Sequence, residues 1–265
     1  MRCWIADDHA RSGVLDAQVW TLFLGDPLEL VDDVHLVLEA EADEEPWLVF
    51  DGDGQSSLFR VMKGTLELRG MVLQNGHAED GGAIVAWERL TIERGALENN
   101  EAWGWGGAIA FTGASENDHL RIVQSTVSGN DAWWARGILL SGDQVRFVLD
   151  RSILAYHGGP DIASEATSLM HENHGYNLVG SVDDLPGFAH PTDLIGIDPG
   201  LSALAQHGGL FPSVAPSPTS PVVDHVPVAA CLDLDGDPLL VDQRGFPRPA
   251  GAGCDIGAFE VQSGP

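Results

Sequence analysis

Short runs in which apolar and polar residues alternate recur along the middle of the chain. Each run is about five residues long with a period of two, which is typical of a strand with one buried face. Four regular runs lie at 65–69, 89–93, 119–123 and 145–149. Less regular runs lie at 20–24, 35–39, 47–50 and 153–155. The pattern predicts an all-β chain built from short strands.

A repeated motif separates these runs. Asn75, Asn100 and Asn130 each stand six residues before a block, which reads Gly-Gly-Ala-Ile in the first two copies and Arg136-Gly-Ile-Leu in the third. The copies begin 25 and then 30 residues apart. That period is too short for a strand–helix–strand unit and fits one coil of a parallel β-helix, or solenoid. Such coils bury their inner faces only by stacking, with strands about 4.8 Å apart.

The repeated polar and glycine positions have a structural interpretation. We expect Asn75, Asn100 and Asn130 to form an internal ladder, in which each side chain bonds to the next coil and to the backbone of the bend. The paired glycines suit tight corners where a Cβ would clash. The predicted organisation is an N-terminal cap or remnant over 1–18, β-helix coils over 19–160, and a largely irregular segment over 161–265 that caps or flanks the coils.

Two of the three cysteines lie close together in the C-terminal part. Cys231 and Cys254 bracket a segment rich in Pro, Gly and Asp that has little room for a core of its own. A disulfide between them would close a loop of about 24 residues and contribute roughly 3 kcal/mol. It would also imply an oxidising compartment. The alternative is a pair of free buried thiols, and Cys3 is left over in either case.

The repeats and the C-terminal part together resemble a known family. The Gly-Gly-Ala-Ile blocks resemble the repeats of polymorphic outer-membrane-type surface proteins, and the C-terminal part resembles the bacterial "choice-of-anchor Q" domain. The matching segments are Gly175-Tyr-Asn-Leu-Val-Gly180, Asp193-Leu-Ile-Gly-Ile-Asp-Pro199, Leu204-Ala-Gln-His-Gly-Gly209, Ser217-Pro-Thr-Ser-Pro-Val-Val-Asp224, Asp242-Gln-Arg-Gly-Phe-Pro-Arg-Pro249 and Cys254-Asp-Ile-Gly-Ala-Phe-Glu260. The resemblance covers roughly residues 45–260.

The resemblance implies a right-handed parallel β-helix of pectate-lyase-like architecture. It implies export and a bacterial cell-surface or secreted location, but no defined activity. The chain departs from the family pattern in its third repeat, and it shows neither a leader in Met1–Asp8 nor an anchor before Pro265. We expect the native leader and anchor to lie outside this sequence.

The charge balance excludes several classes of partner. The chain of 265 residues has 13 basic and 40 acidic side chains, for a net charge of −27. A phosphate backbone needs a basic face, so nucleic-acid binding is not expected, and neither is docking on anionic lipid. No apolar run is long enough for a membrane-spanning helix.

Four tryptophans fall in corresponding loops of two successive coils. They are Trp103, Trp105, Trp133 and Trp134. Stacked coils would bring these loops about 5 Å apart and form an aromatic patch. Flat rings suit the apolar faces of sugars, and exposed aromatic patches mark binding sites. The alternative is that the rings pack on one another or beneath the C-terminal segment.

Acidic turns suggest calcium as a bound cation. Asp233, Asp235 and Asp237 alternate around a glycine, as in the first half of a calcium loop, although Arg244 stands where the closing Glu of such a loop would be. Asp51 and Asp53 form a second, weaker candidate. Solvated Asp/Gly turns are the alternative for both.

Histidines offer a weaker metal candidate. His171 and His174 lie three residues apart, with His157 upstream, and on a helix such a pair could share a metal. The segment leads into a loop motif instead, so we expect loop histidines that face solvent.

Three functions remain open from the sequence. The favoured interpretation is an exported binding module, adhesin-like, with a polysaccharide or a surface protein as its partner. One alternative is a calcium-dependent polysaccharide lyase, whose base would be an arginine such as Arg121, Arg146 or Arg151, or the single lysine Lys63. The other alternative is a structural spacer.

Overall fold

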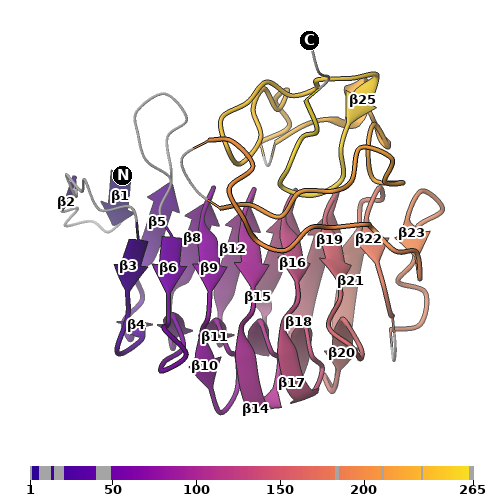
Figure 1. The fold of residues 1–265 in the computed structure, drawn as a ribbon. Coiled ribbons are helices and arrows are strands. Elements are labelled where there is room, and N and C mark those ends of the chain that lie inside the picture. Colours follow the sequence, from indigo (N-terminus) through magenta and orange to yellow (C-terminus); the bar gives the residue numbers. More distant parts are fainter. Residues whose placement is uncertain are drawn as a thin grey trace.

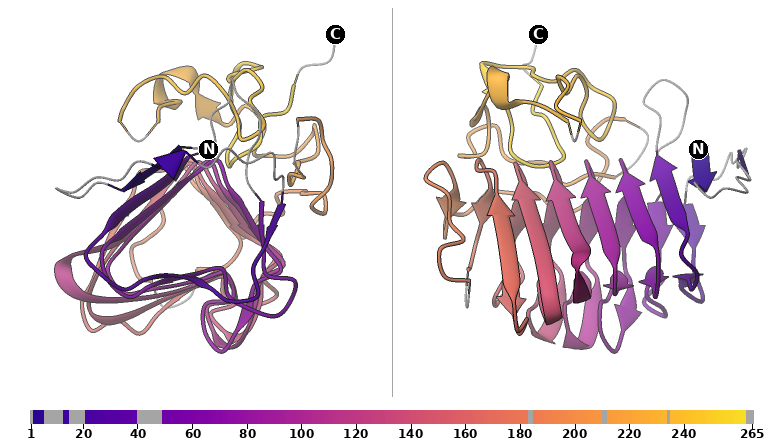
Figure 2. Two further views of the ribbon diagram at one scale, coloured as in Figure 1. Left: turned by 90° about the vertical axis from the view of Figure 1, so that its left-hand side faces the viewer. Right: turned by 180° about the vertical axis from the view of Figure 1, so that it is seen from behind.

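The chain folds as a parallel β-solenoid. The computed structural model describes residues 2–5, 13–14, 21–39, 49–182, 185–209, 212–233 and 235–262. Its coils stack side by side along one axis, and the view down that axis is triangular (Figures 1 and 2). The all-β prediction is confirmed, since helix in the described residues is limited to a single short 3-10 segment, Val228–Ala230.

Three faces make up the triangle, each a stack of short parallel strands. Sheet I contains β3 (Thr21–Phe23), β6 (Val49–Asp51), β9 (Val72–Gln74), β13 (Ala96–Glu98), β16 (Thr126–Ser128), β19 (Ile153–Ala155), β22 (Leu178–Val179) and β23 (Leu194–Ile195). Face II contains β4 (Leu28–Leu30), β7 (Phe59–Val61), β11 (Ile84–Ala86), β20 (Ile162–Ser164) and the first parts of β15 (Ile109–Val123) and β18 (Ile138–Asp150). Face III contains β5 (His35–Glu39), β8 (Thr65–Arg69), β12 (Arg89–Glu93), the later parts of β15 and β18, and β21 (Leu169–Asn173).

The alternating runs located these strands well. The runs at 35–39, 65–69, 89–93 and 153–155 coincide with β5, β8, β12 and β19. The runs at 119–123 and 145–149 are the later parts of β15 and β18, which continue unbroken around the corner from face II.

Apolar side chains fill the bore as vertical columns. Leu66 pairs in register with Leu90, Leu90 with Leu120, and Leu120 with Phe147, and all four are fully buried. Because side chains alternate between the two faces of a strand, the residues on either side of each of these four point outward. At the far end of the bore, Phe188 stacks on Phe147 with ring centroids 5.7 Å apart and closes the core.

The strand register corrects the predicted asparagine ladder by one residue. Asn100 and Asn130 do stack: the Asn100 side-chain amide donates to Asn130 Oδ1 at 2.9 Å, as does the Asn100 backbone N–H. The residue across from Asn100 in the preceding coil is Gly76, whose N–H donates to Asn100 Oδ1 at 2.9 Å. Asn75 instead lies at the left-handed turn position before it, with φ 54°, and its amide bonds to Asp51.

In the third repeat, the strand register also differs by one residue from the alignment of the sequence motif. Ile138 pairs with Ile109, so the corner equivalent to Gly106-Gly107 is Ala135-Arg136. Ala135 keeps the positive φ of that corner, 51°. Gly107 itself is required by close packing, because a Cβ there would lie 2.2 Å from the carbonyl oxygen of Arg136 in the next coil.

At the N-terminal edge the chain reverses direction. β1 (Arg2–Ile5) pairs antiparallel with β5, and β2 (Gly13–Val14) pairs antiparallel with β1. The other residues of the predicted cap over 1–18 lie outside the described part of the chain.

The solenoid extends further than the predicted boundary at residue 160. β20, β21 and β22 continue the parallel ladders, and β23 pairs with β22. The chain beyond β23 then runs back along the corner between sheet I and face III, and does not cover the open end (Figures 1 and 2). It includes the hairpin of β24 (Val226–Pro227) and β25 (Gly253–Cys254).

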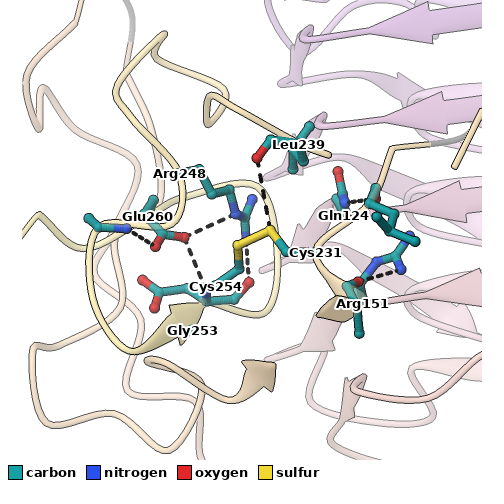
Figure 3. Close-up of a disulfide and its surroundings, with 12 residues drawn as sticks. Gln124, Arg151, Cys231, Leu239, Arg248, Gly253, Cys254 and Glu260 are labelled. Carbon is teal, nitrogen blue, oxygen red and sulfur yellow. Dashed lines mark hydrogen bonds and ion pairs between the residues drawn. A yellow bond between two sulfur atoms is a disulfide. The ribbon is translucent and has the colours of Figure 1, made fainter. Parts of the chain in front are cut away.

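Hydrogen bonds hold this C-terminal segment against the corner. Arg151 Nη1 donates to the Ala230 carbonyl at 2.7 Å, and Gly257 N–H donates to the Arg151 carbonyl at 2.9 Å. The Gln124 amide donates to the Leu232 carbonyl. Figure 3 shows Gln124 and Arg151 reaching from the solenoid toward the segment.

A disulfide and a buried ion pair hold the segment together internally. The predicted Cys231–Cys254 disulfide is confirmed, with Cα atoms 6.1 Å apart. Beside it, the Arg248 guanidinium lies 3.0 Å from Glu260 Oε2, and both side chains are almost fully buried (Figure 3). Burial raises the pKa of Glu260 to about 7, although Arg248 opposes the shift.

The ladder predicts a large cost for removing one rung. Asn130→Ala leaves the buried Asn100 N–H and the Leu97 carbonyl without their partners. We expect the free energy of unfolding to fall by roughly 2 kcal/mol or more, measured by chemical denaturation. The exposed Asn117→Ala is the control and should change it by less than about 0.5 kcal/mol. Equal losses in the two variants would contradict the ladder.

A buried carboxyl in sheet I predicts a pH-dependent stability. Burial raises the pKa of Glu98 to about 8, and only a hydrogen bond from Ser128 opposes the shift. In the unfolded chain the Glu98 carboxyl ionises near pH 4.5. The stability that comes from binding its proton in the folded state is therefore complete below pH 4.5 and is lost as pH rises toward 8. Because the pKa of Glu260 is raised to about 7, its ionisation also lowers the stability of the folded protein as pH rises toward 7.

The test compares melting temperatures of the wild type and Glu98→Gln between pH 5 and pH 8.5. We expect the difference between them to grow in favour of the variant as pH rises. The exposed Glu116→Gln should leave the profile of the wild type unchanged. Parallel profiles for wild type and Glu98→Gln would show that the Glu98 carboxyl is ionised in the folded protein.

Candidate binding site on the tryptophan flank

A small additional sheet projects from the corner between sheet I and face II. It contains β10 (His77–Ala78), β14 (Glu101–Trp105) and β17 (Asp131–Trp134), stacked in that order. Figure 1 shows it at the lower edge of the solenoid, on the side away from the C-terminal segment. The predicted tryptophans lie on two of these strands.

Strand alternation decides which of these side chains face solvent. Ala102 and Ala132 pair with each other and are buried, so their neighbours in each strand point outward. Trp103 is 69% exposed and Trp133 is 79% exposed. These two rings therefore lie on the outer surface of neighbouring strands and are not covered by the C-terminal segment.

The other two tryptophans are less exposed. Trp105 is 40% exposed and pairs in register with Trp134 across a bulge. Trp134 is half-buried and packs against the small cluster of Ala135, Leu139 and Ala163. Trp134 thus anchors the sheet to the solenoid, whereas Trp103 and Trp133 present their rings to solvent.

Contacts with the preceding coil hold the β14 strand in place. The Trp105 N–H donates to Asp80 Oδ1 at 3.0 Å, and the Gly104 N–H donates to the Glu79 carbonyl at 2.7 Å. A Cβ at Gly104 would lie 2.5 Å from Asp80 Oδ1, which explains the glycine between the two tryptophans. The exposed rings are therefore carried on hydrogen-bonded strands.

A polar pocket lies beside Trp103. It has a volume of about 330 Å³ and is lined by Asp53, Gly54, Asn75, Gly76, His77, Asn99 and Glu101. The His77 ring meets the Trp103 ring edge to face, with centroids 5.0 Å apart, and its Nδ1 lies 3.6 Å from Glu101 Oε2. His77 therefore joins the pocket to the aromatic surface. We call Trp103, Trp105 and Trp133 together with this pocket the tryptophan flank.

The turn geometry explains the polar residues of the pocket. Asp53, Asn75 and Asn99 have φ of 51°, 54° and 55°, in the left-handed region. Apart from glycine, Asn and Asp enter this region most readily. The sequence motif had assigned Asn75 to the interior ladder, and it had not singled out His77, Asn99 or Glu101. The adjacent pair Asn99-Asn100 was the signal that the turn has both an outer and an inner asparagine.

The acidic turn at 233–237 does not provide a formed calcium cage. Asp233 Oδ1 accepts the backbone N–H groups of Asp235 and Asp237, at 3.0 and 2.9 Å. Within the described ranges, no three His, Cys, Asp or Glu side chains converge to hold a metal ion. Calcium at this turn stays a prediction from the sequence.

The three candidate metal histidines lie in different surroundings. His157 is buried, with Nδ1 2.5 Å from Asp161 Oδ1, and it continues the column above Asn130. His171 points toward the end of the bore and contacts Phe188. His174 is on the outer surface beside Asp150. The structure does not bring them together.

The candidate bases of a lyase are also dispersed. Arg121 and Arg146 line a separate hollow on face III. Arg151 is bound to Asp150 and to the C-terminal segment. None of these three residues lines the polar pocket of the tryptophan flank.

Comparisons of the chain with protein-family profiles, with curated proteins and with solved structures found no match. Among the described residues, no helix is both long enough and apolar enough to cross a membrane. The functional assignment therefore rests on the geometry of the tryptophan flank.

Proposed function

We propose that the protein is a binding module that recognises a polysaccharide through the tryptophan flank. The observation that carries the proposal is the pair Trp103 and Trp133, more than two-thirds exposed on adjacent strands of the small sheet. Large apolar rings are seldom left in water without a partner, and clustered ones mark binding surfaces.

The spacing and stiffness of the flank suit a sugar chain. Adjacent strands lie about 4.8 Å apart, so the two rings are carried at neighbouring positions on one surface. The C–H faces of sugar rings pack on aromatic faces, and the sugar hydroxyls need polar partners at their edges. Asn75, Asn99, Glu101 and Asp53 supply such partners in the adjoining pocket. Because the strands are already ordered, little conformational entropy is lost on binding.

Charge narrows the class of sugar. Asp53 and Glu101 line the pocket, Asp131 stands beside Glu101 in the next strand, and the whole chain carries a net charge of −27. A uronate would be repelled by this surface, whereas a neutral or amino sugar would not. The flank therefore favours neutral or cationic polysaccharides.

Two further observations support an exported location. The disulfide favours an oxidising compartment. The C-terminal segments that resemble the choice-of-anchor Q domain support export to the bacterial surface or exterior. A surface protein as partner and a spacer role are the competing functions, and glycan binding distinguishes sugar recognition from both.

The first prediction concerns the two exposed rings. Trp103→Ala/Trp133→Ala should weaken glycan binding by about 5- to 150-fold, because two ring contacts of about 0.5–1.5 kcal/mol each are lost. Binding is measured on a glycan array, with calcium and with a chelator. Phe23→Ala removes an aromatic ring of similar exposure on sheet I and should leave binding unchanged. A blank array with folded wild-type protein would exclude sugar recognition and leave a protein partner or a spacer role.

A second prediction concerns the acidic lining. Asp53→Asn/Glu101→Gln should reduce the preference for glucosamine oligomers over galacturonate oligomers, because it removes two carboxylates from the pocket. The ratio of the two dissociation constants, measured by calorimetry, reports this directly. Glu116→Gln removes an exposed carboxylate elsewhere and should keep the wild-type ratio. A ratio that is unchanged in the double variant would show that the pocket does not contact the sugar.

A further inference from the structure

A cationic hollow lies on the outer surface of face III, the side of the triangle opposite the small sheet. It has a volume of about 210 Å³ and is lined by His119, Arg121, Arg146, Val148, Glu172 and His174. These residues come from three successive coils. They lie on β15, β18 and β21, except His174, which directly follows β21. In a chain with 13 basic and 40 acidic side chains, two arginines and two histidines around one hollow are a marked local excess.

Arg121 stands at the centre of this arrangement without a partner of its own. It forms no ion pair and no side-chain hydrogen bond with the described residues. Every other arginine whose side chain is described forms an ion pair. They are Arg60, Arg69, Arg89, Arg94, Arg136, Arg146, Arg151, Arg244 and Arg248. The guanidinium of Arg121 lines the hollow and has no protein partner among the described residues.

Arg121 and Arg146 supply the positive charge of the hollow, and His119 lies beside both. His119 pairs in register with Arg146, which places both beside Arg121. Burial lowers the pKa of His119, and Arg121, Arg89 and Arg146 lower it further. Glu172 lies 2.5 Å from Arg146 Nη2 and 3.8 Å from His174 Nε2, and therefore compensates that side of the hollow. Among the described residues no carboxylate forms an ion pair with Arg121, although Asp150 is near enough to interact with it electrostatically.

We propose that this hollow binds the tetrahedral oxyanion of a sulfate or phosphate ester. The guanidinium groups of Arg121 and Arg146 present more N–H donors than the two oxygens of a carboxylate need, even with Glu172 bound to Arg146, and they suit the three terminal oxygens of an ester group. The volume of the hollow is below the usual range of whole-ligand pockets, so it admits a charged group and not a complete sugar. Val148, only 4% exposed, forms an apolar floor that strengthens the contact between charges.

The site is independent of the tryptophan flank. It lies on another face and uses other residues. It binds an anionic group, whereas the tryptophan flank favours neutral or cationic sugars. Because the chain as a whole repels anions, binding must come from short-range contacts with the guanidinium groups, and long-range attraction contributes nothing.

The test is an NMR titration of the intact protein with inorganic sulfate and inorganic phosphate, followed through the imidazole signals of His119 and His174. Acetate is the planar comparison, and ionic strength is held constant with chloride. We expect saturable shifts with sulfate or phosphate, and at least tenfold weaker binding of acetate. Comparing the two tetrahedral anions identifies the preferred ester. Shifts that match those caused by chloride alone would overturn the proposal.

Variants locate the binding. Arg121→Gln should weaken sulfate binding at least tenfold, and Arg121→Lys should restore only part of it, because lysine keeps the charge and loses the planar fork. Arg60→Gln removes a half-exposed arginine from face II and should have no effect. Trp103→Ala/Trp133→Ala should also leave sulfate binding intact, so failure of either proposal can be told from failure of the other. Full affinity in Arg121→Gln, checked for its melting temperature, would refute the site.

Discussion

The register between coils is the constraint on which the rest of the structure depends. Each coil must place its apolar side chains on the columns of the coil beneath, as Leu66, Leu90, Leu120 and Phe147 do. A shift of one residue would turn these side chains outward and empty the bore. The buried amides of Asn100 and Asn130 reinforce the same register, since each satisfies backbone groups of its neighbour. Polar and charged residues that differ from coil to coil are therefore found mainly at corners and at outward-facing positions.

Both proposed sites arise from that restriction. The tryptophan flank is an added strand inserted at one corner, where Ala102 and Ala132 keep the inner contact and Trp103 and Trp133 occupy the outer positions. The hollow on face III consists mainly of outward-facing positions on regular strands, such as Arg121 opposite Val148. In each case the solenoid sets the spacing between side chains, and the choice of outward residue sets the chemistry. Aromatic rings and acids meet on one side, and guanidinium groups on another.

Sequence patterns predicted the strands better than they predicted the sites. The period of two located β5, β8 and β12 to the residue, because a buried column demands strict alternation. The asparagine motif aligned Asn75 with Asn100, whereas the structure places Asn75 opposite Asn99. The bulge in β14 adds one residue between Asn99 and the Gly106 corner, so counting back from the glycines reaches Asn100 in that coil. The polar pocket and the cationic hollow were not predicted, since both depend on residues that only the stacking of coils brings together.

The C-terminal segment has a consequence for the order of folding. Its docking contacts join residues that are far apart in sequence, 108 positions for Gln124 with Leu232 and 132 positions for Thr126 with Ala258. Closing such long loops costs entropy that local strand pairing does not, so these contacts form late. The corner that receives the segment exists only once the coils carrying Gln124 and Arg151 have stacked. The C-terminal segment therefore acts as a latch that closes on a finished solenoid, and nascent chains would expose that corner until the segment itself has been synthesised.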